Sequence, residues 1–347
     1  MSPCPSRSGP PPRLVPREPD LDALEAALET SLADATSETK DELRRLARYR
    51  APPSAHLDFP KNKLAGVLVL LHLNPLGELS VTLTTRSQRL RSHPGETALP
   101  GGRWEEGDGE GGAWTALREA HEEINLPLPP RESIFPSPSA TLTAAAPPPS
   151  HLLHLTTLPP FTSRTLLVVL PVVFVLLAPA ASASTTYLPA TLRPSPDEVA
   201  AVFHLSLRAF LLLPPSSPPC PPKPATRGSR PAPGTETLTH TQEDFLWLLR
   251  RPYRLHAFSS PVDGVTPSAV TGLTADIVVE CAVIARGTNE CGFVRRARGQ
   301  MRWEETVSVA LEMSGRKGLG ERVSGEEEVD VVRIEDGQEE NGEEERT

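Results

Sequence analysis

The sequence predicts a mixed α/β fold built around one sizeable core. Two apolar runs of strand length, at residues 64–73 and within 165–181, are rich in leucine and β-branched residues, as buried strands are. Segments with the helical spacing of apolar residues accompany them, at residues 20–49, around 115–124 and at 273–285. Strands mixed with amphipathic helices indicate an α/β protein.

The N-terminal part of the chain divides into two segments. Residues 1–19 are rich in proline, and we expect them to be disordered. Residues 20–49 predict one or two amphipathic helices, and together these segments form an N-terminal region, 1–55. A folded domain is expected at 56–286, opening with strands at 64–73 and 77–85 that a turn at 74–77 joins.

The second half of the chain alternates between apolar and low-complexity segments. Residues 136–163 and 214–234 are rich in proline and small residues, and we interpret them as disordered loop insertions. Residues 165–181 are shorter than the usual membrane span of about twenty and contain Pro171 and Pro179, so they predict a buried strand pair. We expect helices at 242–251 and 273–285, and a largely disordered acidic tail at 287–347.

Composition excludes several classes of protein. The 347 residues carry a formal net charge of -9, and we expect neither a nucleic-acid partner nor a membrane span. Cys4, Cys220, Cys281 and Cys291 lack the paired spacing of a zinc site or a disulfide framework. The oligomeric state is left open by the sequence.

A short acidic helix carries the clearest chemical signal. Glu119, Glu122 and Glu123 are spaced i, i+3 and i+4, so their carboxylates share one helix face and repel one another. Mg²⁺ or Mn²⁺ would remove that repulsion and keep coordination places for water and phosphate oxygens. Gly102, just before the acidic loop, offers a carbonyl as a further ligand, and Thr115 is expected to cap the helix. The alternative is an ordinary solvated helix.

The segment from residue 102 to 126 resembles the Nudix box, G-x5-E-x7-R-E-U-x-E-E-x-G-U with U aliphatic, and departs from it at two places. The loop before Arg118 is about two residues longer than the pattern, so its acid is either Asp108 or Glu110. Asn125 stands where the pattern has glycine, and asparagine is the next best residue for a left-handed helix end. Pro127 then prevents further helix.

Flanking segments narrow the resemblance to the coenzyme A diphosphatases of the Nudix superfamily. LTTRSQRLRSHPGETALPGG at residues 83–102 is similar to that family's upstream signature. PSPDEVAAVFHLSL at 194–207 and VTGLTA at 270–275 resemble two later segments in the same order. Three positions depart from the family pattern: Leu99, Ser206 and Thr271.

The resemblance implies a Nudix-type α/β/α sandwich and metal-assisted hydrolysis of the diphosphate in coenzyme A or acyl-CoA. The products would be 4′-phosphopantetheine, acylated where the substrate was, and adenosine 3′,5′-bisphosphate. The resemblance assigns the metal to Gly102, Glu119, Glu122 and Glu123. Glu119 or Glu122 would serve as the base if not as a ligand, and Arg118 would orient an acidic neighbour. For Glu198 three roles stay open: a ligand, a base or a structural acid.

A basic segment precedes the acidic helix. Arg86, Arg89, Arg91 and His93 are candidate contacts for the diphosphate and the 3′-phosphate of coenzyme A, since arginine presents a planar fork to phosphate. The alternative is that some of these arginines pair with surface carboxylates at Glu96, Glu105 or Glu106.

Two other functions stay open at this stage. One is a Nudix hydrolase for another nucleoside diphosphate compound, such as NADH or ADP-ribose. The other is a catalytically weak ligand sensor or scaffold whose proline-rich loops bind partner domains. The family implies an intracellular protein of the peroxisome or mitochondrion, although the sequence shows no clear targeting signal and ends Glu345-Arg346-Thr347.

Overall fold

A computed structural model describes residues 18–51, 59–109, 111–131, 151–177, 191–212, 237–262, 265–289, 291–317 and 332–333. Its longer helices are α1 (Leu21–Glu29), α2 (Ser37–Arg48), α3 (Ala113–Ile124), α5 (Gly272–Arg286) and α6 (Trp303–Lys317). Its strands are β1 (Leu64–Leu73), β2 (Leu79–Arg86), β3 (Thr97–Ala98), β4 (Gly101–Arg103), β5 (Leu152–Thr157), β6 (Phe161–Thr162), β7 (Val168–Leu176), β8 (Val199–Ser206), β9 (Thr239–Leu246), β10 (Pro252–Ser259), β11 (Val270–Thr271) and β12 (Val332–Arg333).

β1 is the centre of the larger sheet, whose main order is β3-β2-β1-β7-β5. It pairs in parallel with β7 and antiparallel with β2 and β4. Because successive side chains of a strand point to opposite faces, an unbroken apolar run needs cover on both sides. Leu68 and Leu70 pack with the apolar face of α3, whereas Val69 and Leu71 pack in the cluster that includes α1, α2 and α5.

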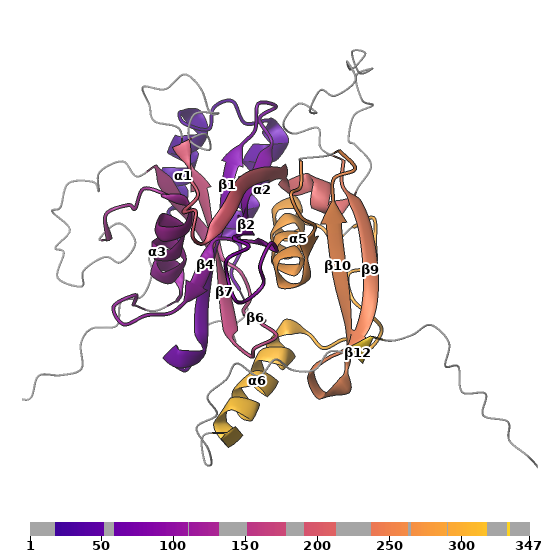
Figure 1. Cartoon of the computed structure of the whole chain (residues 1–347). Coiled ribbons are helices and arrows are strands. Elements are labelled where there is room, and N and C mark those ends of the chain that lie inside the picture. The colour runs from indigo at the N-terminus through magenta and orange to yellow at the C-terminus, as the bar shows by residue number, and fades with distance from the viewer. Residues whose placement is uncertain are drawn as a thin grey trace, which may run out of the picture.

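The helices therefore form two layers with the sheet between them. Figure 1 shows α3 and α5 on opposite sides of the central strands, with β9 and β10 beyond α5. This arrangement confirms the predicted mixed α/β sandwich. The predicted N-terminal helices are also confirmed, and Leu28 and Leu43 are fully buried in the same core as Val69. They belong to the folded unit and are not a separate N-terminal segment.

A second sheet, ordered β11-β10-β9-β12, corrects the expected helix at residues 242–251. The first half of that segment lies in β9, which pairs with β10 at eight positions from Leu246↔Pro252 to Thr239↔Ser259. Arg254 fastens the pair by donating two hydrogen bonds, of 2.7 and 2.8 Å, to the Asp244 carboxylate. Cross-strand pairing therefore overrides the weak helical pattern of this segment. Only Leu248–Arg250 forms a short 3-10 turn.

Three other expectations need correction. Within the described part of residues 165–181 there is a single strand, β7, where a strand pair was expected. β7 pairs with β5 and β6, which precede it in the chain. β5 and β6 lie inside the expected insertion 136–163, so its last residues belong to the sheet. The rest of that insertion up to residue 150 and all of 214–234 fall outside the described residues.

The expected tail also contains folded structure. Helix α6 buries Val307 and Ala310 to 2% and 1% exposure, and β12 pairs with β9. Val307 packs with Phe59 and Val168, so residues distant in sequence share one cluster. The acidic composition of residues 318–347 favoured a disordered tail, so the apolar stripe of α6 was not predicted. Among the described helices, none combines the length and apolar character that crossing a bilayer requires.

Candidate active site

Helix α3 holds the acidic residues in place by packing closely on β1. A side chain at Gly66 would collide with the carbonyl of Gly112, so glycine permits the helix start to approach the strand. Gly112 is the N-cap, in the left-handed conformation, and Thr115 lies inside the helix; the expected Thr115 cap is wrong. At the other end Asn125 adopts φ 54° and ψ 36°, which confirms its predicted left-handed role.

The three glutamates of α3 differ in exposure. Glu123 is 7% exposed, and its Oε2 accepts a 3.3 Å hydrogen bond from the Gly101 amide. The Glu119 side chain is 17% exposed and the Glu122 side chain 50%. Strand β4 closes over the buried end, and a Cβ at Gly102 would fall on the Glu119 carboxylate. The double glycine therefore leaves room for carboxylate oxygens beside the backbone.

Arg118 is the internal counter-ion of this cluster. Its Nε and Nη2 each donate to Asp108 at 3.1 Å, and its Nη1 donates to Glu119 at 3.1 Å and to Glu122 at 3.3 Å. The buried Asp108, one of the two candidate loop acids, also accepts from the Glu105 amide. Glu110 falls outside the described residues.

Burial changes the ionisation of these carboxyl groups. It raises the pKa of Glu123 to about 8, and the neighbouring Glu119 adds to that rise. Burial also raises the pKa of Glu119, although Arg118 opposes the change. At Asp108 burial acts in the same direction, but hydrogen bonds from Arg118 and the Glu105 amide outweigh it and lower the pKa. The cluster thus has more carboxyl groups than Arg118 can pair with, and burial favours the protonated form of Glu123.

Crowded carboxylates and a glycine carbonyl at a strand edge supply the oxygen ligands that a hard divalent cation prefers. As the side chains stand, no three His, Cys, Asp or Glu groups within the described ranges are close enough to chelate a metal. Arg118 engages Glu119 and Glu122 instead. A cation would compete with Arg118 for these oxygens.

Glu198 and Arg86 join the cluster from the sheet side. The Ser87 amide donates to the Glu198 carbonyl at 2.8 Å, which ties the end of β2 to the start of β8. The charge of Glu198 raises the pKa of Glu119 and Glu123, after burial and nearer groups, whereas Arg86 lowers that of Glu123. The buried Nε of Arg86 has no hydrogen-bond acceptor among the described residues.

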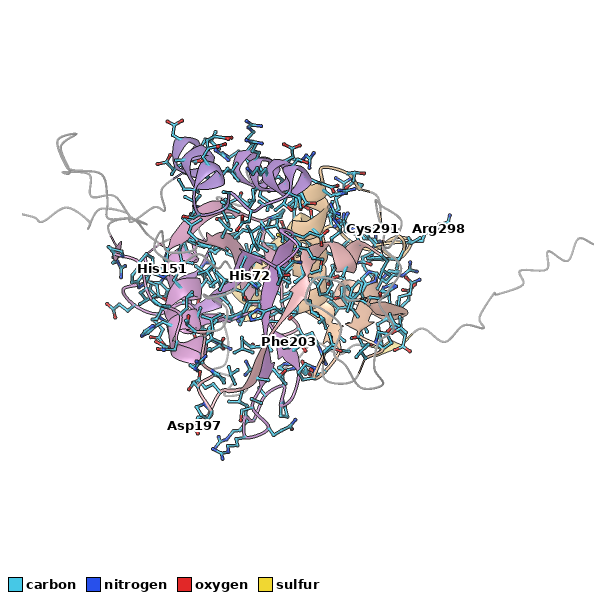
Figure 2. All side chains as sticks on the ribbon, turned by 90° about the horizontal axis from the view of Figure 1, so that it is seen from above. His72, His151, Asp197, Phe203, Cys291 and Arg298 are labelled. Carbon is cyan, nitrogen blue, oxygen red and sulfur yellow. The ribbon has the colours of Figure 1, made fainter. Side chains whose placement is uncertain are left out.

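The predicted basic residues separate into two groups. Arg86 and His93 line a cavity of about 790 Å³, and His93 lies 3.0 Å from Glu96 through Nδ1. Arg89 and Arg91 are exposed and are not part of that lining. Arg89 pairs with Asp197, which Figure 2 shows at the periphery of the molecule. The pairing alternative therefore holds for Arg89, with a partner that the sequence did not suggest.

The cavity continues toward the acidic helix. A second cavity of about 270 Å³ is lined by Gly101 and Gly102, and the two share Arg86, Arg103 and Thr274. The larger cavity also has aromatic residues that were not predicted from the sequence; they come from the second sheet and α6: Phe245, Trp247, Tyr253 and Trp303. The available sequence signal was that Phe245, Trp247 and Tyr253 lie within nine residues of one another, in a chain with only 5% aromatic residues.

Several curated proteins are similar in sequence to parts of this chain. The chain is 38% identical over 161 residues to "Nudix hydrolase 15, mitochondrial" of Arabidopsis thaliana, covering 46% of each chain. It is 48% identical over 62 residues to "Peroxisomal coenzyme A diphosphatase ndx-8" of Caenorhabditis elegans, covering 18% of this chain and 26% of the relative. A Saccharomyces cerevisiae "Peroxisomal coenzyme A diphosphatase 1" is 37% identical, covering 26% of this chain and 28% of the relative. The chain thus spans about half or less of each relative's length.

Among solved structures, a Nudix hydrolase from M. smegmatis, RenU, matches with 20% identity and a TM-score of 0.29, covering 43% of this chain and 73% of the other. A MutT/nudix family protein from Enterococcus faecalis matches with 12% identity and a TM-score of 0.32, covering 91% and 98%. No family model matches the chain. The curated relatives confirm the resemblance that the acidic helix and its flanking segments indicate: over part of its length this chain is similar to Nudix hydrolases, coenzyme A diphosphatases among them.

Proposed function

We propose that the protein is a pyrophosphohydrolase that cleaves the diphosphate of coenzyme A or acyl-CoA with Mg²⁺ or Mn²⁺. The observation that carries this proposal is the carboxylate cluster on α3, which lies against Gly101 and Gly102. These two glycines line a cavity together with Arg86 and Arg103. Carboxyl groups beyond those that Arg118 pairs with suit a divalent cation, and arginine in the cavity suits a substrate with several phosphates. The coenzyme A diphosphatases among the relatives support the choice of substrate.

Glu119, Glu122, Glu123 and the Gly102 carbonyl would hold the cation. When bound, the cation would lower the pKa of a coordinated water and neutralise charge on the leaving phosphate. Glu198 lies close enough to Glu119 and Glu123 to influence both, so it is our candidate for a further acidic residue at the site.

Arg118 and Asp108 position the cluster. Two hydrogen bonds fix the guanidinium on Asp108, and the remaining nitrogen then aligns Glu119 and Glu122. A fixed orientation lowers the cost of organising the carboxylates for reaction. Arg86 would contact a substrate phosphate, because its buried Nε has no acceptor among the residues described.

For the compartment we propose the mitochondrion or the peroxisome, since the relatives' names include both. Imaging of the full chain carrying a tag at either end would test this. Co-localisation with neither organelle would overturn it.

The decisive test of activity is a side-by-side product analysis of four substrates with Mg²⁺ or Mn²⁺: coenzyme A, its 3′-dephospho form, NADH and ADP-ribose. We expect coenzyme A to be cleaved with a kcat/KM roughly ten- to a hundredfold above that of the dephospho form, the scale of one charged contact. Arg86→Gln should lower kcat/KM more than Arg89→Gln. Faster cleavage of NADH or ADP-ribose than of coenzyme A would overturn the proposed substrate. Cleavage of none of the four compounds would favour a ligand sensor.

A further inference from the structure

The ionisable residues of the larger cavity are mostly basic. Three of the described residues that line it are arginines: Arg86, Arg103 and Arg164. Among the same residues there is one carboxylate, Glu96, and it lies 3.0 Å from His93. The whole chain carries a formal net charge of -9, so the basic lining is a local property of this cavity. Such a lining favours an anionic ligand.

Arg164 lies in a tight turn between β6 and β7. The Ser163 amide donates to the Leu167 carbonyl, and the Leu167 amide donates to the Ser163 hydroxyl, both at 3.0 Å. Leu166 anchors the turn, since it adopts φ 58° and is buried in a cluster with Trp247. The backbone that carries Arg164 is therefore fixed, and its side chain is part of the cavity lining.

Helix α5 begins at the same cavity. Four consecutive residues at its start line the cavity: Thr271, Gly272, Leu273 and Thr274. Within the described helix, no side chain caps this end at Thr271, and the first turn contains no acidic residue. The first amides of a helix lack partners inside it, and the N-terminus carries a partial positive charge. The helix start therefore adds to the positive potential of the arginines.

The turn and the helix start lie close together along one cleft. Three of their residues also line the smaller cavity: Ser163, Leu273 and Thr274. Strand β6, which leads into the turn, contacts α5. The two cavities share several residues and form one cleft, in which Gly102 lines only the smaller part and Arg164 only the larger. Arg164 is thus separated along the cleft from the acidic end at α3.

We propose that Arg164 and the start of α5 bind a phosphate of the substrate that is separate from the diphosphate to be cleaved. A phosphate monoester carries close to two negative charges at neutral pH, and its oxygens can accept from a guanidinium and from backbone amides together. Arg89 and Arg91, the sequence candidates for such a contact, are not part of the lining.

The proposal rests on the proposed function in one respect: the diphosphate lies beside Gly102, near α3. It deepens that function, because a separate phosphate distinguishes coenzyme A from the alternatives. Coenzyme A carries one at the 3′ position, whereas NADH and ADP-ribose have none.

Binding of two nucleotides without a diphosphate tests the site, since neither is cleaved. Calorimetric titration of the full chain with Mg²⁺ would compare adenosine 3′,5′-bisphosphate with AMP, which lacks the 3′-phosphate. We expect the bisphosphate to bind roughly ten- to a hundredfold more tightly, the scale of one charged contact. Arg164→Gln should remove most of this difference by weakening the bisphosphate alone. Arg164→Lys keeps the charge without the planar fork and should retain part of it.

Arg298→Gln is the matched control, because it removes the same charge from an exposed arginine that Figure 2 shows at the periphery of the molecule. It should leave both affinities at the wild-type value. Arg164 is also exposed, so we expect its variants to keep the wild-type thermal transition. The same variants are then assayed with coenzyme A and its 3′-dephospho form, and Arg164→Gln should raise KM for coenzyme A alone.

Two binding results would overturn the proposal. One is a wild-type protein that binds the bisphosphate no more tightly than AMP. The other is an equal loss for both nucleotides in Arg164→Gln, which would mean that Arg164 attracts anions without contacting a separate phosphate.

The kinetic assay distinguishes this proposal from the proposed function. If the bisphosphate binds more tightly through Arg164 while coenzyme A is not hydrolysed, the phosphate site stands and the proposed function fails. If coenzyme A is hydrolysed but Arg164→Gln leaves its preference over the dephospho form unchanged, the proposed function stands and the phosphate site fails.

Discussion

The two ends of the cleft use opposite chemistry. At α3, Glu119, Glu122 and Glu123 crowd three carboxyl groups against a strand edge, and Arg118 pairs with Glu119 and Glu122. At the second sheet, Trp247 and Tyr253 form a neutral aromatic surface. A charged cluster stabilises charge that develops during reaction, whereas an aromatic wall contributes equally before and during it. We therefore expect the α3 end to control kcat and the aromatic end to control affinity.

The largest effect should come from the carboxylates. Replacing Glu122 or Glu123 by Gln removes a charge and a ligand together, and we expect kcat to fall by at least about a hundredfold. Steady-state kinetics with saturating Mg²⁺ measures this, and Glu106→Gln on the exposed part of the loop is the control. Near-normal turnover in Glu123→Gln would contradict the expectation that the α3 end controls kcat.

The fold itself should respond to pH far from either end of the cleft. Burial at the far end of β1 lowers the pKa of His72 to about 4. An unfolded histidine titrates near 6.5, so between these values the unfolded chain binds more protons and stability falls as the pH is lowered. The loss should approach about 3 kcal/mol by pH 4. His72→Leu should flatten the pH dependence of unfolding by urea; an unchanged slope would contradict this.

Helix α6 tests whether the aromatic end depends on the segment first interpreted as a tail. Val307→Ala leaves a cavity between α6 and the cluster around Val168, and we expect a loss of about 2 kcal/mol in unfolding free energy. The exposed Ser308→Ala should change it by less than about 0.5 kcal/mol. Equal stabilities for the two variants would mean that α6 does not support this wall.

The smallest effect should come from Gly102→Ala. Its Cβ would displace the Glu119 carboxylate, which sits at the free end of a flexible side chain. We therefore expect kcat to fall by about tenfold, on the scale of 1.4 kcal/mol, with little change in thermal stability. A stability loss without a kcat loss would show that Gly102 serves strand pairing alone.

The sequence was informative where chemistry fixes spacing. Carboxylates four residues apart share a helix face in any context, so the grouping of Glu119 and Glu123 followed from their positions. Asn125 was predictable for the same reason, since few residues tolerate a left-handed helix end. The choice between Asp108 and Glu110 was not, because it depended on the path of a loop with two extra residues.

The sequence was less informative where distant segments decide the structure. Residues 242–246 form a strand because β10 pairs with them, and that pairing is not encoded in the segment itself. Arg89 was a candidate phosphate contact with surface pairing as the alternative, and no local signal pointed to Asp197 as its partner. The aromatic wall needs β9, β10 and α6 together, so its residues carried no common motif.

The parallel pairing of β1 with β7 has a consequence for synthesis. Leu64 pairs with Val168 and Leu71 with Val175, so the middle of the sheet joins positions about a hundred residues apart. At ribosomal rates of about 5–20 residues per second, one edge of the apolar strand β1 waits roughly 5–20 s for its partner. β2 can cover the other edge at once, through the adjacent turn. The waiting edge is open to wrong pairing, which makes the nascent chain, rather than the folded protein, the form most exposed to aggregation.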